Sequence, residues 1–190
     1  MSAAGQIIIL NGAPRSGKSS IARAIQQEFE GAWINLGVDA SMAMTPERYR
    51  PGIGLRPGGE RPDLEPVVQK LYAGLFESIA AHARLELNVV ADLGMHDAYS
   101  APLGIFGDMQ ARLAGLPVLL VGVLCPLDTI MARRNADPRG GFYAAGDTVP
   151  DPVRRWQDEV HRGMAYDLTL DTSRWNPAQC ATTIQHHLGK

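Results

Sequence analysis

Eight residues near the N-terminus, Gly12-Ala13-Pro14-Arg15-Ser16-Gly17-Lys18-Ser19, decide the fold of this chain. They match the pattern G-x-x-x-x-G-K-[ST], in which a glycine-rich loop cradles phosphate groups with its backbone N–H groups. An apolar run, residues 6–10, precedes the loop, and a segment with helical periodicity, residues 18–29, follows it. The pattern therefore predicts a P-loop between a core strand and a helix, and a glycine-rich turn without a ligand is the alternative.

The residue types in this loop fit the chemistry of a bound nucleotide. Lys18 would place a positive charge beside the β- and γ-phosphate oxygens, and the Ser19 hydroxyl would bind Mg²⁺. The helix that follows would direct its positive end at the same phosphates. We therefore expect ATP and Mg²⁺ as cofactors. The predicted nucleotide-binding residues are those of the loop and the residue after it: Gly12, Ala13, Pro14, Arg15, Ser16, Gly17, Lys18, Ser19 and Ser20.

Apolar runs of strand length alternate with longer segments of helical period, which is typical of an α/β protein. Most of the runs lack polar alternation, as expected for a parallel sheet that is buried on both faces. We predict a three-layer fold of the P-loop NTPase type, with a five-stranded parallel sheet flanked by helices. The expected strands span residues 6–10, 32–36, 87–91, 117–124 and 168–170. The expected helices span residues 18–29, 66–85, 101–114, 127–135, 152–165 and 177–188.

The composition limits the classes of partner. The 190 residues, 45% hydrophobic and 20% charged, suit a single domain that spans residues 1–190. A formal net charge of −2 leaves no excess of basic residues for a nucleic-acid backbone, so we expect no nucleic-acid partner. The run at 6–10 is too short for a signal peptide or a membrane span, which favours a cytoplasmic protein without a membrane partner. Two cysteines, Cys125 and Cys180, support no disulfide framework, and a homo-oligomer of unspecified size is compatible with the sequence.

Two long stretches match neither a helix nor a strand. Residues 45–62 are dense in proline, glycine and arginine, and residues 137–150 contain a glycine pair. Loops of this length in a small domain are either functional lids or disordered segments. We interpret both stretches as mobile lid loops.

Carboxylates end two of the predicted strands, at the edge where open α/β sheets bind ligands. Asp92 follows the third strand and is predicted to hold the metal ion, with a strand cap as the alternative. Asp39 follows the second strand and is the predicted general base, which would orient an attacking hydroxyl and accept its proton. An N-cap for a following helix is the alternative for Asp39. His96 and Asp97 either line the site or are solvated loop residues.

Positive charge over a transferred phosphoryl group would come from arginines in or beside the second lid loop. Arg133, Arg134 and Arg139 are the candidates, and one of the first two could instead complement the dipole at a helix C-terminus. The first lid loop contains further arginines that could contact an anionic or aromatic substrate. None of those is assigned a role.

Five segments, in this order and spacing, resemble the chloramphenicol phosphotransferase family of P-loop kinases. They are residues 7–19 with the start I-I-L-N-G, 33–39 with G-V-D, 89–92, 121–125 with V-G-V-x-C, and 160–172 with V-H-x-G-x-x-Y-D and D-T. The resemblance covers most of the chain. It is weakest between residues 39 and 63, the region that should surround the acceptor.

The resemblance implies that the P-loop binds ATP, that Asp39 is the catalytic base and that Arg133 is a lid arginine. Arg139 is an approximate match for the second lid arginine. Arg134 stands where the family is expected to have an acidic residue, so the choice between Arg134 and Arg139 stays open. The predicted catalytic residues are Asp39, Lys18, Arg133 and Arg139, and the predicted metal ligands are Ser19 and Asp92.

We therefore expect an ATP-dependent O-phosphotransferase that moves the γ-phosphate of Mg-ATP to a hydroxyl of a small molecule. Chloramphenicol or a related antibiotic is the candidate acceptor that the resemblance implies. Two alternatives remain. One is a P-loop regulator whose nucleotide orders the lid loops for a protein partner. The other is a kinase for a nucleotide or a nucleotide-sugar, which the arginines of the first lid loop would suit.

Overall fold

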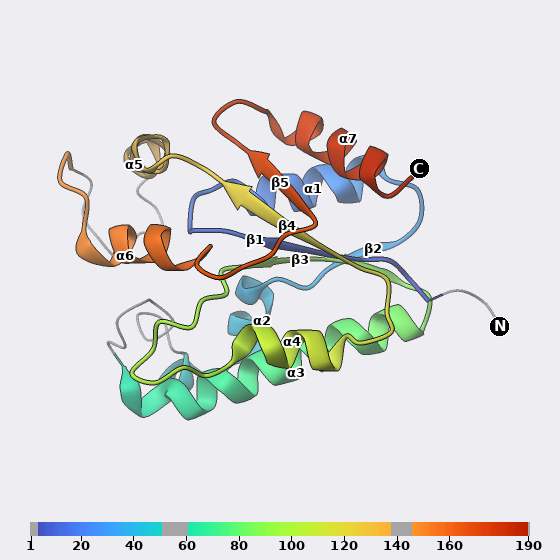
Figure 1. Ribbon diagram of the computed structural model, residues 1–190, viewed down its shortest axis with the longest axis horizontal. Helices are drawn as coiled ribbons and strands as arrows, with labels where there is room; N and C mark the ends of the chain where they lie inside the picture. Colours follow the sequence, from blue (N-terminus) through green and yellow to red (C-terminus); the bar gives the residue numbers. More distant parts are fainter. Residues whose placement is uncertain (1–3, 51–60, 138–145, 190) are drawn as a thin grey trace.

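The computed structural model describes residues 4–50, 61–137 and 146–189 (Figure 1). The described residues form one five-stranded sheet with the strand order β2-β3-β1-β4-β5. All four strand pairs are parallel, which confirms the predicted α/β fold. The strands are β1 (Ile7–Asn11), β2 (Trp33–Asn35), β3 (Asn88–Leu93), β4 (Val118–Leu124) and β5 (Leu168–Asp171).

Helices cover both faces of the sheet. Figure 1 shows α1 and α7 on one face, α3 and α4 on the other, and α5 and α6 beyond the ends of β1 and β4. A short helix, α2, follows β2. The helices are α1 (Lys18–Glu28), α2 (Val38–Met44), α3 (Glu65–Arg84), α4 (Ile105–Arg112), α5 (Leu127–Ala136), α6 (Asp151–Glu159) and α7 (Pro177–His187).

The central strand explains why its sequence shows no polar alternation. All five residues of β1 are buried, because each face of the strand packs on a different core. Ile7 and Ile9 belong to the cluster beneath α3 and α4. Ile8 and Leu10 belong to the cluster beneath α1 and α7. A strand that is covered on both sides therefore reads as a nearly continuous apolar run, here Ile7 to Leu10, with the buried polar Asn11 at its end.

Two predicted helix boundaries were wrong for reasons of local backbone geometry, and one short helix was missed. The helix expected at 101–114 begins only at Ile105, because Gly104 at φ 67° occupies its N-cap. The helix expected at 152–165 ends at Glu159, and the chain then turns through Gly163 at φ 70°. Helix α2 was not assigned, since seven residues are too few to show a helical period.

The first of the two stretches interpreted as mobile lid loops contains some regular structure. Within 45–62, the described residues form the short 3₁₀ helices η1 (Glu47–Tyr49) and η3 (Pro62–Leu64), the second of which leads into α3. Residues 51–60 and 138–145, which include Arg139, lie outside the described residues. Among the described helices, none is long and apolar enough to span a membrane. Cys125 and Cys180 are free and buried.

Gly122 in β4 makes a close approach that allows a testable prediction. A Cβ atom at this position would lie 2.6 Å from the ring of Tyr166. We expect Gly122→Ala to lower the free energy of unfolding by about 1–3 kcal/mol, because the ring has to move out of a packed interior. Urea denaturation measures this. The control is Gly107→Ala in α4, where a Cβ meets nothing within 4 Å, and equal loss in both variants would contradict the prediction.

Candidate active site

The P-loop leaves the end of β1 and opens α1 at the centre of the sheet. Gly17 is the N-cap of α1 and has a φ of 101°, a conformation that favours glycine. No side chain caps this helix, and its first turn contains no acidic residue. The free N–H groups of the first turn therefore remain available for an anion, in the field of the helix dipole.

One buried atom in the loop has the properties expected beneath a phosphate group. Ser16 is buried, and its Oγ atom has no hydrogen-bond partner among the described residues. Buried hydroxyls are normally hydrogen-bonded, so an unpaired hydroxyl in a phosphate-binding loop is suited to donate a hydrogen bond to a phosphate oxygen. The loop residues therefore suit a nucleotide, as the sequence predicted.

Lys18 lies across the loop. Its Nζ atom donates hydrogen bonds to the carbonyl oxygens of Gly12 at 2.8 Å and Ala13 at 2.9 Å. Burial lowers the pKa of Lys18 to about 8, against the opposing effect of the Asp92 and Asp39 carboxylates. The ammonium group therefore lies within electrostatic reach of both carboxylates.

The two predicted metal ligands come together. The Ser19 hydroxyl donates a hydrogen bond to Oδ2 of Asp92 at 2.5 Å, although the residues are 73 positions apart. In the described part of the chain no cluster of three or more His, Cys, Asp or Glu could hold a metal ion. A hydroxyl and one carboxylate instead suit Mg²⁺, which keeps several waters and takes other ligands from substrate phosphates.

Asp39 is the second residue of α2, and it lies in the same cleft as Lys18. The cleft has a volume of about 640 Å³. Gly37 is the N-cap of α2, and no side chain caps this helix, so the alternative role of Asp39 as an N-cap does not apply. Asp39 is exposed, and no hydrogen bond to another described residue holds its carboxylate away from a substrate. The cleft is lined by Pro14, Arg15, Gly17, Lys18, Ser19, Ser20, Ile21, Asp39, Arg133, Thr172, Trp175 and Pro177.

The first two arginine candidates differ in position. Arg133 lines the cleft, and its guanidinium group donates to the carbonyl oxygens of Arg15 at 3.2 Å and Thr172 at 2.6 Å. In this arrangement it braces the P-loop against the end of β5. Arg134 is buried and does not line this cleft. A phosphate contact by Arg133 or Arg139 stays a prediction.

Sequence reasoning missed one wall of the cleft. Thr172 accepts from Arg133 and donates from its Oγ1 atom to the Ser16 carbonyl oxygen at 2.6 Å, which ties the P-loop to β5. Trp175 lies beyond it and is 40% exposed. The D-T pair of the family pattern pointed to Thr172, whereas no pattern marked Trp175. An exposed aromatic ring beside a phosphate cradle is suited to stacking on a base.

His96 and Asp97 have structural contacts instead of a place in the cleft. His96 is buried and stacks on Tyr99 with ring centroids 4.5 Å apart. Oδ1 of Asp97 accepts from the backbone N–H groups of Leu103 and Gly104, both at 2.9 Å. Asp97 therefore holds the turn before α4.

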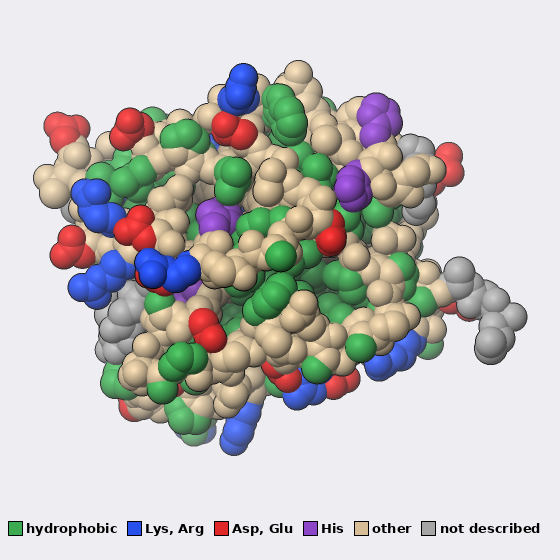
Figure 2. All heavy atoms as spheres, viewed as in Figure 1, with side chains coloured by type: hydrophobic (Ala, Val, Ile, Leu, Met, Phe, Trp, Pro, Cys, Tyr) green, Lys and Arg blue, Asp and Glu red, His purple; other side chains and the backbone are tan. Residues whose placement is uncertain are grey.

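Charge on the molecular surface is mixed. On the face drawn in Figure 2, Lys and Arg side chains are interspersed with Asp and Glu side chains. Such a face has no continuous positive field of the kind that attracts a nucleic-acid backbone.

The lowered pKa of Lys18 predicts how nucleotide affinity depends on pH. Bound phosphates stabilise the ammonium form of Lys18, so the pKa of Lys18 is higher in the nucleotide-bound protein than in the free protein. Below about pH 8 Lys18 is charged in both the free and the nucleotide-bound protein. Above that pH the free protein has lost this proton, so binding must take it up again. We expect affinity to be constant from pH 7 to 8 and then to fall, by at most about tenfold per pH unit.

Isothermal titration calorimetry in two buffers with different ionisation enthalpies would detect the proton uptake at pH 9 and its absence at pH 7. Lys18→Arg is the control, because arginine stays charged throughout this range. A wild-type affinity that is flat to pH 9.5 would contradict the prediction.

Comparison with known proteins places this site in a family. The sequence matches the family described as chloramphenicol phosphotransferase-like protein over residues 5–189. No curated protein matches the chain significantly.

Solved structures share the fold at low sequence identity. One is the APS kinase of Mycobacterium tuberculosis in complex with AMPPNP and APS, with TM-score 0.63, 18% identity, and 100% of each chain covered. A second is the tunicamycin resistance protein of Deinococcus radiodurans, with TM-score 0.62, 16% identity, and 97% of this chain and 96% of that chain covered. A third is the shikimate kinase of Acinetobacter baumannii in complex with shikimate, with TM-score 0.61, 13% identity, and 97% and 93% covered.

The family match spans nearly the whole chain, and the P-loop, the Ser19–Asp92 pair and Asp39 all lie within it. The parallel sheet with its P-loop at the end of the central strand is also the architecture of the kinases that it resembles. The chain is therefore a P-loop kinase that belongs to the chloramphenicol phosphotransferase-like family.

Proposed function

We propose that this protein transfers the γ-phosphate of Mg-ATP to a hydroxyl group of a small molecule. The observation that carries the proposal is the convergence in one cleft of Lys18, Ser19 and the exposed carboxylate of Asp39, with Asp92 bonded to Ser19. A phosphate cradle by itself would serve a regulator equally well. A free carboxylate beside it supplies the group that a hydroxyl acceptor needs.

Each residue has a separate task in the proposed reaction. The N–H groups of the P-loop and Lys18 bind the phosphates. Ser19 and Asp92 would hold Mg²⁺, which supplies positive charge to the phosphate oxygens when it is bound. Asp39 orients the acceptor hydroxyl and takes its proton as the new O–P bond forms and the bond between the γ-phosphorus and the β–γ bridging oxygen breaks, releasing ADP.

The other end of the cleft is suited to the nucleoside. Trp175 and Pro177 lie at the junction of β5 and α7, beyond Thr172 and Arg133. The exposed indole offers a flat apolar face to a purine. The base would then lie on the side of the P-loop that is remote from α2, and Asp39 would be left for the acceptor.

The acceptor is proposed to be a hydroxylated antibiotic or metabolite, and chloramphenicol is the candidate that the family suggests. The described residues enclose a second, apolar cavity of about 410 Å³ between α2 and α3. It is lined by Gly37, Ala40, Ser41 and Met44, which lie on the face of α2 opposite Asp39. That cavity therefore does not present an acceptor to the base.

Mass spectrometry tests the proposal directly. Hydroxylated antibiotics and metabolites, with chloramphenicol and shikimate among them, would be incubated with protein, ATP and either Mg²⁺ or EDTA. The expected product is about 80 Da heavier than its parent, by the mass of one phosphoryl group, and forms only with Mg²⁺. Nucleotide binding with no modified acceptor in a broad panel would instead support the regulator.

A further inference from the structure

The side chain of Asn11, the residue directly before the P-loop, is buried and fully hydrogen-bonded. Asn11 has no solvent exposure. Its Oδ1 atom accepts from the backbone N–H of Met95 at 2.6 Å, which fixes the orientation of the amide, since a backbone N–H can only donate. Its Nδ2 atom then donates to the Val160 carbonyl oxygen at 2.9 Å and to the Tyr166 hydroxyl at 3.0 Å.

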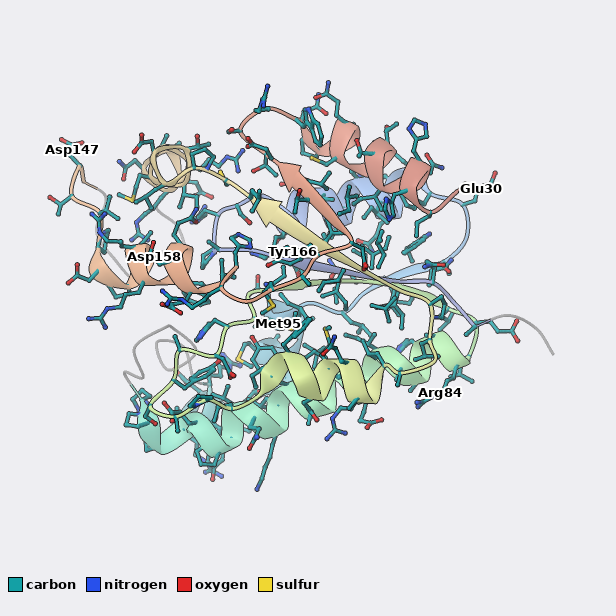
Figure 3. The ribbon with its side chains drawn as sticks, in the orientation of Figure 1. Glu30, Arg84, Met95, Asp147, Asp158 and Tyr166 are labelled. Carbon is teal, nitrogen blue, oxygen red and sulfur yellow. The ribbon has the colours of Figure 1, made fainter. Side chains whose placement is uncertain are left out.

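The amide joins segments that are remote in sequence. Met95 follows β3, whereas Val160 and Tyr166 belong to the connection between α6 and β5. Figure 3 shows Met95 and Tyr166 near the middle of the view. The Tyr166 hydroxyl is bonded in turn to the Nδ1 atom of His161 at 2.8 Å, and the Tyr166 ring lies close against Gly122.

These bonds fix β3, which carries Asp92, against β1, which leads through the P-loop to Ser19 on α1. Asn11 and Leu93 are paired at the ends of β1 and β3, and the Gly12 N–H donates to the Leu93 carbonyl oxygen at 3.2 Å. Beyond that point the backbones diverge, and the Asn11 amide continues the pairing as far as Met95. Asp92 therefore lies on a strand whose end is held to β1 twice, by the backbone pairing at Leu93 and by the Asn11 side chain at Met95.

We propose that Asn11 is a positioning residue for the metal site. By holding β1 to β3, it sets the spacing between Ser19, at the start of α1, and Asp92 on β3. This inference rests on the proposed function only in assigning Mg²⁺ to that pair. Asn11 touches neither substrate nor metal and acts through the two strands. The 2.5 Å contact between Ser19 and Asp92 is the spacing that it maintains.

The asparagine amide is the group that meets this requirement in one side chain. It supplies an acceptor for Met95 and two donors for Val160 and Tyr166. An aspartate of the same shape would keep the acceptor but would bring a second oxygen against the Val160 carbonyl oxygen and remove both donors. Asn11→Asp therefore changes the clamp and leaves the volume of the core unchanged.

The test is a ratio of affinities. The affinity for a non-hydrolysable ATP analogue would be measured by calorimetry in Mg²⁺ and in EDTA. The affinity in Mg²⁺ divided by the affinity in EDTA isolates the contribution of the metal. We expect Asn11→Asp to lower this ratio about tenfold, as loss of supporting contacts around a metal site does, with the affinity in EDTA little changed. Tyr166→Phe, which retains the ring on Gly122, should lower it less and in the same direction.

The matched control is Asn88→Ala. Asn88 lies at the other end of β3, and its Oδ1 atom accepts from the Gln6 N–H of the chain entering β1 at 2.9 Å. Asn88 ties the same two strands together far from the P-loop, so Asn88→Ala should lower thermal stability without changing the ratio. Ser19→Ala should abolish the effect of Mg²⁺ altogether.

The outcomes separate this inference from the proposed function. An unchanged ratio in both Asn11→Asp and Tyr166→Phe overturns the inference, as does an equal fall in Asn88→Ala. A wild-type protein whose nucleotide affinity ignores Mg²⁺ overturns it as well. A protein that binds Mg-nucleotide with the expected ratios but phosphorylates no acceptor supports the inference and contradicts the proposed function alone.

Discussion

Replacement of Asp39 by asparagine is expected to lower kcat for phosphoryl transfer about 10²- to 10⁴-fold, the usual contribution of a positioned general base. Asparagine keeps the size of the side chain and can still accept a hydrogen bond from the acceptor, but it cannot take the proton. Asp39 is exposed at the start of α2 and caps no helix, so the substitution should leave the fold intact. A coupled assay for ADP release measures kcat, and calorimetry measures nucleotide affinity.

Asp128→Asn is the matched control. Asp128 is likewise the exposed second residue of a helix, α5, and it does not line the cleft. Its loss of charge at a helix N-terminus should cost at most about 1 kcal/mol of stability and leave kcat unchanged. A rate in Asp39→Asn within threefold of the wild-type rate would remove Asp39 from the role of base.

Gly37→Ala is expected to abolish Mg²⁺-dependent transfer. A Cβ atom at this position would lie 1.7 Å from Oδ1 of Asp92, a distance that no rearrangement of a few tenths of an ångström can relieve. Either Asp92 leaves its contact with Ser19, or α2 moves and takes Asp39 with it. Both movements remove a proposed catalytic group, and overpacking of this kind also costs about 1–3 kcal/mol of stability.

Calorimetry with and without Mg²⁺ would show which movement occurs, since only displacement of Asp92 removes the effect of the metal. The control is Gly74→Ala in α3, where a Cβ meets nothing within 4 Å. That substitution should stabilise the protein by up to about 1 kcal/mol, because alanine favours a helix. Wild-type kcat in Gly37→Ala would show that the contact is absent in solution.

The pairing of Gly37 with Asp92 explains why the family pattern G-V-D begins with glycine. The sequence identified the aspartate at the end of this triplet as a base, but it gave no reason for the glycine two residues earlier. In the structure, the backbone at Gly37 passes directly over the Asp92 carboxylate. The glycine serves the metal site, and the aspartate serves the acceptor.

Local patterns were reliable wherever a single segment makes its own geometry. The glycines and lysine of the P-loop and the helix that follows them are consecutive in the chain, so this unit could be predicted from residues 12–29 alone. The central strands β1 and β4 could be recognised because burial on both faces favours runs of apolar residues. Boundaries failed at the start of α4, where the left-handed backbone of Gly104 delays the helix, and at the end of α6, which stops at Glu159 before the left-handed turn at Gly163.

The sequence by itself determined the α/β architecture, the phosphate cradle and the two carboxylates at strand ends, because each follows from a periodicity or a spacing along the chain. The contact between Ser19 and Asp92, the bracing of the P-loop by Arg133 and Thr172, the cleft wall at Trp175 and the clamp made by Asn11 were decided only by the tertiary structure. Each joins residues that are dozens of positions apart, and their distances are set by how the strands are ordered in the sheet. Strand order depends on how whole helices pack on its two faces, and no single segment encodes that.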